Sequence, residues 1–476
     1  MKVTVIEIFL NWLKDNESVF GALASIIAIG SLVVFFISYL VKHPFKQVAK
    51  LAETAAKKVK DENGIPAIGV LPLNAFSDDP NHAHLADGMT EDIITLLSRF
   101  DGFRVIARNS TFAYKGQHPD IRDVGATLGA RYIVEGSLRK AGSKMRTTVQ
   151  LIETAGGTHV WAASYDQQCD DCAETLDEIT NAIVSSLQPE LYRAEWDRVR
   201  LRPAADLNTH QLILRAFAPL YVGFKHNVST RESEALMRLA LTREPENAKA
   251  NAVLAWALGN QSLSSKYGGG NGDHTALLEE AKALGRKAIG LARHDTLVMY
   301  CWAAVLTYSG DREPAIDILA EVLERDPNNA QVMAFMGNVM ARNGQVTEGQ
   351  RHIERAIELS PTDSRLYLWC GYLAWTMLLG NDLDGAYRFA RRGIRLHDRF
   401  FLGWFSLALA AAGLGRDADV RRAMRNVNEI DASFSLSRYH DYAGQLAEHV
   451  EPVLPLLTAA ERVVGGTAIR LAASNE

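Results

Sequence analysis

The sequence predicts an α+β domain followed by an all-α solenoid of paired helices, with one N-terminal transmembrane helix. Three observations predict this arrangement. The run 19–41 is apolar and contains no charged residue, the stretch 65–200 alternates short apolar runs with helical segments, and motifs recur every 34 residues beyond residue 205. The 476-residue chain is 47% hydrophobic and 22% charged, which is typical of a folded protein with a sizeable core.

The composition excludes two broad classes. A net charge of −5 and a pI of about 6.3 argue against a protein that binds nucleic acid over its whole surface. Four cysteines in a chain of this length do not make a secreted disulfide framework. We therefore expect no nucleic-acid partner.

The run 19–41 is long enough to cross a bilayer, since a helix needs about 20 apolar residues to span the ~30 Å core. It is too long for the apolar region of a signal peptide. It separates a short N-terminal segment, 1–18, from a basic helical stalk, 42–64, and six lysines follow it where two precede it. The positive-inside rule then predicts a single-pass protein of the bacterial inner membrane with cytoplasmic domains. A periplasm-facing envelope assembly protein is the alternative.

Residues 65–200 predict the element order β-α-β-α-β-β-β-α. The first strand lies within 65–73, the second within 103–108, and a short helix at 121–129 ends at Gly129, a residue type favoured after a helix. Breaks at 141–143 and 156–157 divide the next stretch into three strands, and a long helix follows. This order indicates helices packed on a mostly antiparallel sheet.

A cluster of carboxylates, Asp87, Glu91 and Asp92, accompanies the first helix of this domain. Asp87 or Thr90 is suited to cap the helix, which would place Glu91 and Asp92 in its first turn, where the helix dipole favours negative charge. A metal or acid–base site is the alternative, but ligands from other segments do not converge there in sequence. We expect no catalytic residue, metal or cofactor.

The same stretch resembles a TolB-like N-terminal-type domain, a module found in proteobacterial proteins between a class III adenylate cyclase domain and tetratricopeptide (TPR) repeats. The matching motifs lie at 70–73, 86–88, 90–93, 105–110, 114–116, 128–140 and 161–166. The resemblance implies a partner-binding module without catalytic residues. Only about sixty residues precede it, so we expect no cyclase domain in this chain.

The 34-residue rhythm is that of TPR repeats, in which each unit is a helix A, a turn and a helix B. Val298-Met299 recurs as Val332-Met333, and Gly310 recurs as Gly344. The small residues that the TPR pattern requires in helix A and helix B, and its closing prolines, fall at Ala303, Gly337, Gly371, Ala315, Gly349, Pro245, Pro327 and Pro361. The repeats are predicted over 205–448, followed by a C-terminal helix and tail, 449–476.

Stacked repeats form a curved surface from their A helices, and aromatic and Arg side chains supply most interface hot spots. On the TPR spacing, this groove would be lined by Tyr300, Tyr308, Asn338, Arg342, Arg365, Tyr372 and Trp375. The alternative is that several of them pack between repeats.

One chemical motif remains, the C-x-x-C pair Cys169 and Cys172. Two aspartates between the thiols would raise their pKa, which argues against a redox pair. The preferred hypothesis is a membrane-anchored, non-enzymatic scaffold or adaptor that binds an unidentified protein partner through the TPR groove and the TolB-like module, in signalling or assembly. A thiol oxidoreductase using the cysteine pair is a further alternative.

Overall fold

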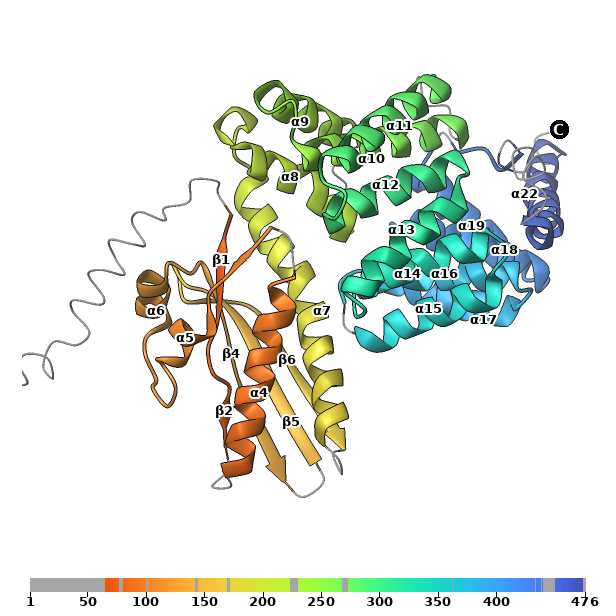
Figure 1. Cartoon of the computed structure of the whole chain (residues 1–476). Coiled ribbons are helices and arrows are strands. Elements are labelled where there is room, and N and C mark those ends of the chain that lie inside the picture. The colour runs from red at the N-terminus through yellow and green to blue at the C-terminus, as the bar shows by residue number, and fades with distance from the viewer. Residues whose placement is uncertain are drawn as a thin grey trace, which may run out of the picture.

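The computed structural model describes residues 65–76, 80–99, 102–141, 144–168, 172–222, 230–267, 273–361, 363–432, 434–437, 439 and 450–473. Within them, a small α+β unit leads through one long helix into an arc of paired helices (Figure 1). The segment 1–18, the apolar run 19–41 and the stalk 42–64 lie outside the described residues.

The predicted localisation needs correction. Across the part of the chain that the structure describes, no helix combines the length and the apolar character needed to cross a bilayer. A single-pass inner-membrane protein is therefore not supported.

The α+β unit, hereafter the module, contains one mixed sheet with the strand order β3-β1-β4-β5-β6, in which β2 also pairs with β4. The strands are β1 (Ala67–Val70), β2 (Asn74–Ala75), β3 (Arg104–Val105), β4 (Tyr132–Ala141), β5 (Lys144–Glu153) and β6 (Thr158–Gln168). β1 is parallel to both β3 and β4, whereas β4, β5 and β6 form an antiparallel meander. The structure has the predicted order of elements with the short strand β2 and an extra helix added.

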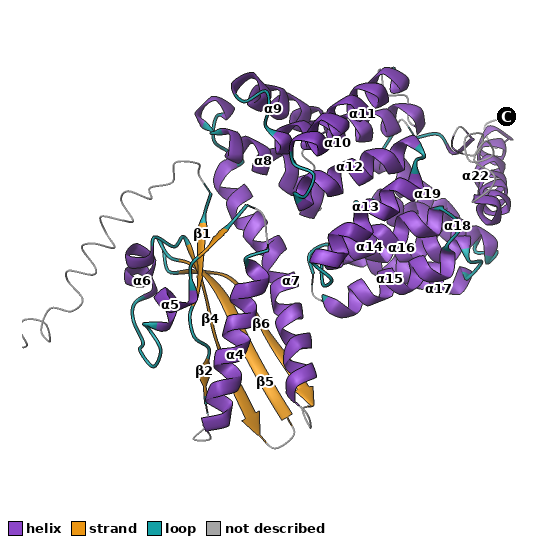
Figure 2. Cartoon of the chain, viewed as in Figure 1, coloured by secondary structure: helices purple, strands orange, loops and turns teal. Residues whose placement is uncertain are grey.

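Four helices cover the sheet unequally (Figure 2). They are α4 (Pro80–Leu97), α5 (Arg108–Phe112), α6 (Ile121–Leu128) and α7 (Cys172–Val199). Buried side chains of α4 and α7, such as Ile93 and Ile183, pack on one sheet face against Val134 and Val149. α6 covers the other face beside β1 and ends at Gly129, whose φ of 62° explains the glycine there.

The predicted cap at Asp87 or Thr90 is wrong, because α4 begins seven residues before Asp87, at Pro80. Thr90 lies inside the helix and is fully buried. Its hydroxyl donates to the carbonyl of Ala86 at 2.7 Å and accepts the backbone N–H of Leu73 at 3.1 Å. Thr90 therefore satisfies a backbone group that follows β1, a role no local capping rule predicts.

The carboxylates of α4 pair with the segment around α5. Asp87 forms an ion pair with Lys115, and Glu91 lies 3.3 Å from Arg108. These four residues belong to four of the motifs that the sequence singled out. Residues of different motifs thus contact one another through their side chains, although the elements that carry them are distant in sequence.

Beyond the module, helices pair in order as A and B members of repeats. The pairs are α8 (Thr209–Val222) and α9 (Thr230–Arg243), α10 (Ala248–Tyr267) and α11 (His274–Leu291), α12 (Thr296–Ser309) and α13 (Arg312–Arg325), α14 (Ala330–Arg342) and α15 (Val346–Leu359), α16 (Leu366–Leu379) and α17 (Leu383–Leu396), and α18 (Phe401–Gly413) and α19 (Asp417–Ile430). A last helix, α22 (Leu454–Ala473), packs on α18 and α19.

The small residues predicted for the repeats allow close helix crossing. A Cβ added to Gly337 would lie 2.5 Å from the carbonyl oxygen of Gly349, and one added to Gly349 would lie 2.4 Å from that of Gly337. Ala303 and Ala315 are fully buried at the same places of the preceding repeat. Together with starts of α12 and α14 that lie 34 residues apart, this confirms TPR repeats.

Helix α7 belongs to two cores. Its residues Leu187 and Leu191 pack in the core of the module, whereas Tyr192 and Trp196 pack in the core of the solenoid. From Tyr192, aromatic rings 5.2–5.9 Å apart continue through Phe217, Trp256, Tyr300 and Phe335, one from each of α8, α10, α12 and α14. One continuous apolar seam therefore joins the module to the repeats.

Candidate partner-binding site on the A helices

The structure brings five of the seven predicted groove residues together on consecutive A helices. Tyr308 is on α12, Asn338 and Arg342 are on α14, and Tyr372 and Trp375 are on α16. Trp256 and Asn260 of α10 join them. These seven residues are called the A-helix cluster below.

Tyr308 connects α10 to α12. Its hydroxyl accepts a hydrogen bond from Trp256 Nε1 at 3.0 Å and donates one to Asn260 Oδ1 at 3.2 Å. Burial raises the pKa of Tyr308, and these two hydrogen bonds oppose that rise. The phenol is thus a neutral hydrogen-bonding group at neutral pH.

Arg342 is the only cation of the A-helix cluster. Its guanidinium lies 4.9 Å from the ring centroid of Trp375, and its Nε donates to Asn338 Oδ1 at 3.2 Å. Among the described residues, no carboxylate forms an ion pair with it. Its positive charge acts on both Tyr308 and Tyr372, whose pKa values it lowers against the stronger effect of burial. The cluster therefore offers a half-buried, uncompensated positive charge among aromatic rings.

The degree of exposure separates the members of the A-helix cluster. Tyr308, Arg342 and Tyr372 are half-buried, whereas Asn338 and Trp375 are 5% and 1% exposed. A partner would therefore meet the guanidinium and the two phenols first, with Asn338 and Trp375 holding Arg342 in place from below.

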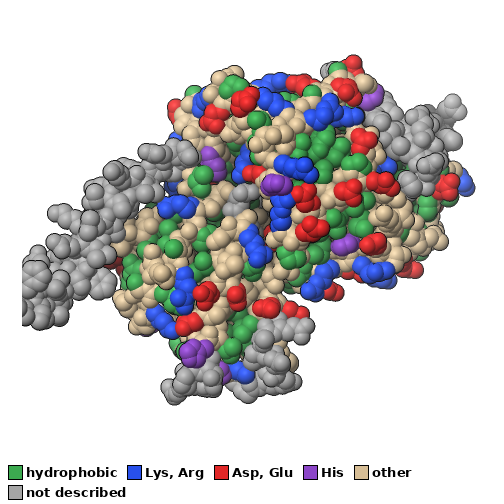
Figure 3. All heavy atoms as spheres, in the orientation of Figure 1, with side chains coloured by type: hydrophobic (Ala, Val, Ile, Leu, Met, Phe, Trp, Pro, Cys, Tyr) green, Lys and Arg blue, Asp and Glu red, His purple; other side chains and the backbone are tan. Residues whose placement is uncertain are grey.

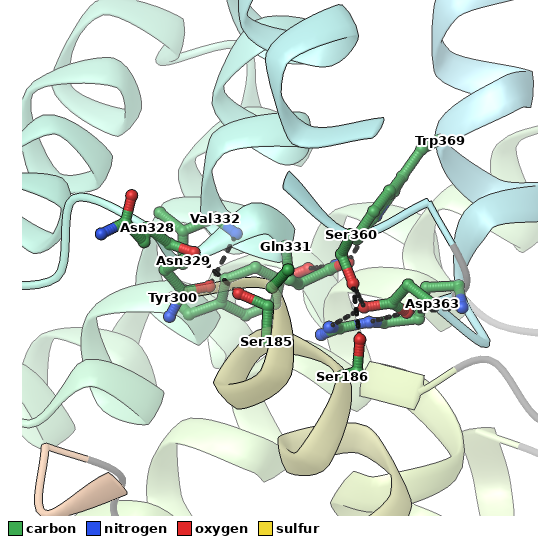
Figure 4. A network of polar contacts seen from close by, with 12 residues as sticks. Ser185, Ser186, Tyr300, Asn328, Asn329, Gln331, Val332, Ser360, Asp363 and Trp369 are labelled. Atoms are coloured by element: carbon green, nitrogen blue, oxygen red, sulfur yellow. Dashed lines mark hydrogen bonds and ion pairs between the residues drawn. The ribbon is translucent and has the colours of Figure 1, made fainter. Parts of the chain in front are cut away.

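The other two predicted residues, Tyr300 and Arg365, lie in the interior. The hydroxyl of Tyr300 accepts a hydrogen bond from Gln331 Nε2 at 2.8 Å, and Gln331 Oε1 accepts one from Trp369 at 2.9 Å (Figure 4). Gln331 thereby bridges three A helices. Tyr300 is 3% exposed and offers little surface to a partner.

Arg365 forms a buried ion pair with Asp363, with Nη2–Oδ2 and Nε–Oδ1 distances of 2.6 and 2.8 Å. Their side chains are 1% and 0% exposed. Asp363 also accepts the backbone N–H of Arg365 at 2.7 Å, which fixes the turn before α16. The pair is thus a structural element of the repeat turn.

This turn and the preceding one seat helix α7 (Figure 4). Ser185 donates to the carbonyl of Asn328 at 3.2 Å, Asn328 Nδ2 donates to Asn181 Oδ1 at 2.8 Å, and the hydroxyls of Ser186 and Ser360 are 3.5 Å apart. The space left in this contact is about 10 Å³, roughly one water molecule. The module is therefore held against the repeats by polar contacts as well as through the shared helix.

Sequence reasoning missed Trp256 and Asn260. α10 starts 48 residues before α12, because the A and B helices of that repeat are long and an insertion at 268–272 separates them. A search with a fixed 34-residue period does not reach α10. The alanine-rich stretch 248–258 was the available signal, since small residues mark a helix that its neighbours approach closely.

The remaining predictions concern cysteines and metals. Cys169 lies outside the described residues, and Cys172 begins α7. Cys301 and Cys370 are buried free thiols, and burial raises the pKa of Cys370 to about 11. In the described ranges, no three His, Cys, Asp or Glu side chains are grouped to hold a metal ion.

Comparison with known proteins identifies partial relatives. No family model matches the chain. The chain is 36% identical over 244 residues to "Putative adenylate cyclase 3" of Rhizobium meliloti (strain 1021), a match that covers 51% of this chain and 40% of that protein. The chain thus spans less than half of the length of this relative.

Several solved structures have a partial likeness to the chain. The human IFIT1 dimer with m7Gppp-AAAA has a TM-score of 0.41 at 13% identity, covering 54% of this chain and 59% of that one. Pseudomonas aeruginosa pilF has a TM-score of 0.33 at 15% identity, covering 50% and 97%. A tetratricopeptide repeat protein from Parabacteroides merdae has a TM-score of 0.29 at 16% identity, covering 53% and 98%.

Proposed function

We propose that this chain is a non-enzymatic scaffold that binds a segment of a partner protein through the A-helix cluster. The observation that carries this proposal is Arg342, a half-buried cation without an ion pair among the described residues. A charge held in this way is stabilised when a carboxylate reaches it, because charge-assisted hydrogen bonds are stronger than neutral ones. The partner segment would therefore present an Asp, a Glu or a free C-terminus.

The module has a second role in the proposal. We take it to be TolB-like, and the pairing of the motif residues Asp87, Glu91, Arg108 and Lys115 supports this. Since α7 belongs to both cores, a partner bound to the module would be held at a fixed distance from one bound to the repeats. The match to part of a putative adenylate cyclase supports a role in signalling or assembly.

A selection from a random peptide library tests the proposal. The full chain, an Arg342→Glu variant and an Arg286→Glu variant would each be used as bait. Arg286 is exposed on the B helix α11 and is a control for the change in net charge. We expect the wild type and Arg286→Glu to enrich the same acidic peptides and Arg342→Glu to lose them. If Arg342→Glu still folds and enriches the same peptides, the A-helix cluster is not the binding site.

A further inference from the structure

Over the visible surface of the solenoid, acidic and basic side chains are mostly interspersed (Figure 3). The outer face of α17 is an exception. Arg388, Arg391, Arg392 and Arg395 lie at positions i, i+3, i+4 and i+7, opposite the buried Ala390. All are exposed except Arg392, which is half-buried, and none forms an ion pair with a described residue. These four residues are called the basic stripe.

A run of like charges on one helix face is unfavourable, because residues at i and i+4 repel each other. Two such pairs exist within the basic stripe. The fold does not need them, since the helix is held by small buried residues such as Ala386 and Gly393. The stripe therefore points to an anionic surface that covers it.

The same solenoid carries a matching anionic surface on α13. The buried residues Ala315, Leu319 and Val322 of α13 correspond in the repeat to Ala386, Ala390 and Gly393 of α17. On this alignment, the positions of Arg388, Arg392 and Arg395 are occupied by Asp317, Glu321 and Glu324, which are called the acidic stripe.

The acidic stripe is accessible. Asp317 and Glu324 are exposed and have no ion pair with a described residue, whereas Glu321 pairs with Arg325. The two stripes have the same spacing and the same orientation relative to their cores. They are complementary in charge at three positions, and the position of Arg391 is occupied by the uncharged Ala320.

Helix α15 lies between these two helices and has a mixed surface. The corresponding positions hold Arg351, Glu354, Arg355 and Glu358, so its outward charges alternate in sign. Such a surface can face a copy of itself without net repulsion. A two-fold axis along α15 would place α13 of one copy over α17 of the other, and the reverse, so that both stripes are paired at once.

We propose that the basic stripe on α17 binds the acidic stripe on α13 of a second copy of this chain. This inference rests on the B helices and is independent of the A-helix cluster. Because the contact is made by exposed charges, it is weak and depends on ionic strength.

Nucleic acid fits the basic stripe less well. Single strands bind on aromatic rings beside a basic groove. The ring next to the stripe, Tyr387, is already faced by Arg391 at 5.7 Å and by Arg416 at 4.4 Å.

Sedimentation velocity of the full chain tests the proposal. Measurements would be made at about 0.01 M salt, where the Debye length is about 30 Å, and at about 1 M, where it is about 3 Å. We expect dimers at low salt that dissociate at high salt. Arg388→Glu with Arg395→Glu should weaken association at least ~10-fold, and Asp317→Arg with Glu324→Arg should do the same.

The combination of all four substitutions is the decisive variant. Because it exchanges the signs at two of the three facing positions and leaves Arg392 opposite Glu321, it should associate within ~3-fold of the wild type. Arg286→Glu is the control and should leave association unchanged, and circular dichroism would show that each variant is folded. A wild type that stays monomeric at low salt overturns the proposal. So does association that neither pair weakens, or a folded fourfold variant that does not recover.

Discussion

The module and the solenoid are held together by different means. In the module, side chains from separate motifs pair with one another, as in Asp87 with Lys115 and Glu91 with Arg108. In the solenoid, helices cross where side chains are absent, as at Gly337 and Gly349. A unit with one copy of each element relies on specific pairs, whereas a repeat reuses one backbone fit at a regular interval.

The two regions meet at α7, and we expect the largest loss of stability from a substitution next to this helix. Replacing Arg365 by Met would leave the fully buried Asp363 without its partner, beside the turn that seats α7. We expect the free energy of unfolding to fall by about 3–5 kcal/mol, measured by urea denaturation. The double variant with Asp363→Asn keeps an acceptor for the backbone N–H of Arg365 and removes the charge. It should recover at least half of the loss; equal instability of both variants would show that the ion pair is not the cause.

In the solenoid, we expect a single added methyl group to disturb the close crossing of α14 and α15. Gly337→Ala would place a Cβ 2.5 Å from a backbone oxygen that cannot move alone. We expect a loss of about 2–3 kcal/mol in thermal or urea unfolding. The matched control is Gly290→Ala on α11, where a Cβ meets nothing within 4 Å. It should stabilise the helix by up to about 1 kcal/mol, and equal effects at both positions would contradict the packing explanation.

In the module, we expect a loss of stability when Thr90 is replaced. Thr90→Val keeps the shape of the side chain but leaves the backbone N–H of Leu73 without its acceptor. The expected loss is about 1–3 kcal/mol. Thr95→Val on the same helix removes only an exposed hydroxyl that donates to the carbonyl of Glu91, and it should change stability by less than about 0.5 kcal/mol. Hydrogen exchange would locate the change: the amide of Leu73 should lose protection in Thr90→Val alone.

The contrast between the regions also decides what the sequence could predict. The repeats were predictable because one rhythm fixes both the helix pairs and their small residues, and Gly337 and Gly349 could be assigned individually. The antiparallel meander of β4, β5 and β6 was predictable from the turns that separate 132–141, 144–153 and 158–168, but the parallel pairing of β1 with β3 and β4 was not predicted. The start of α4 was not predictable from the sequence, since capping rules use only nearby residues. The hydroxyl of Thr90 instead accepts a hydrogen bond from the backbone of Leu73, seventeen positions away.

The candidate site shows the same limit. The spacing of the repeats predicted one face for Tyr308, Arg342 and Tyr372, because A-helix positions recur, and the structure brings these three residues close together. The same spacing placed Arg365 in the groove as well, and there an aspartate two residues earlier holds the side chain in the interior. A periodic pattern says which helix face a residue occupies, and it does not say which local partner competes for its charge.

The smallest predicted effect concerns Glu190 on α7, which lies near the repeat turn that contains Asp363 and Arg365. Burial raises the pKa of Glu190, the negative charge of Asp363 adds to that rise, and Arg193 and Arg365 oppose it. A carboxyl whose pKa is raised by folding destabilises the folded state above that pKa, and the penalty disappears below its ordinary value of 4.5. Glu190→Gln should therefore add about 0.5–1 kcal/mol at pH 7 and almost nothing near pH 3.5, by urea unfolding at both values. Glu178→Gln, an exposed change on the same helix, is the control for the lost charge. An equal gain at both pH values would mean that the ionised form of Glu190 is not the source of the penalty.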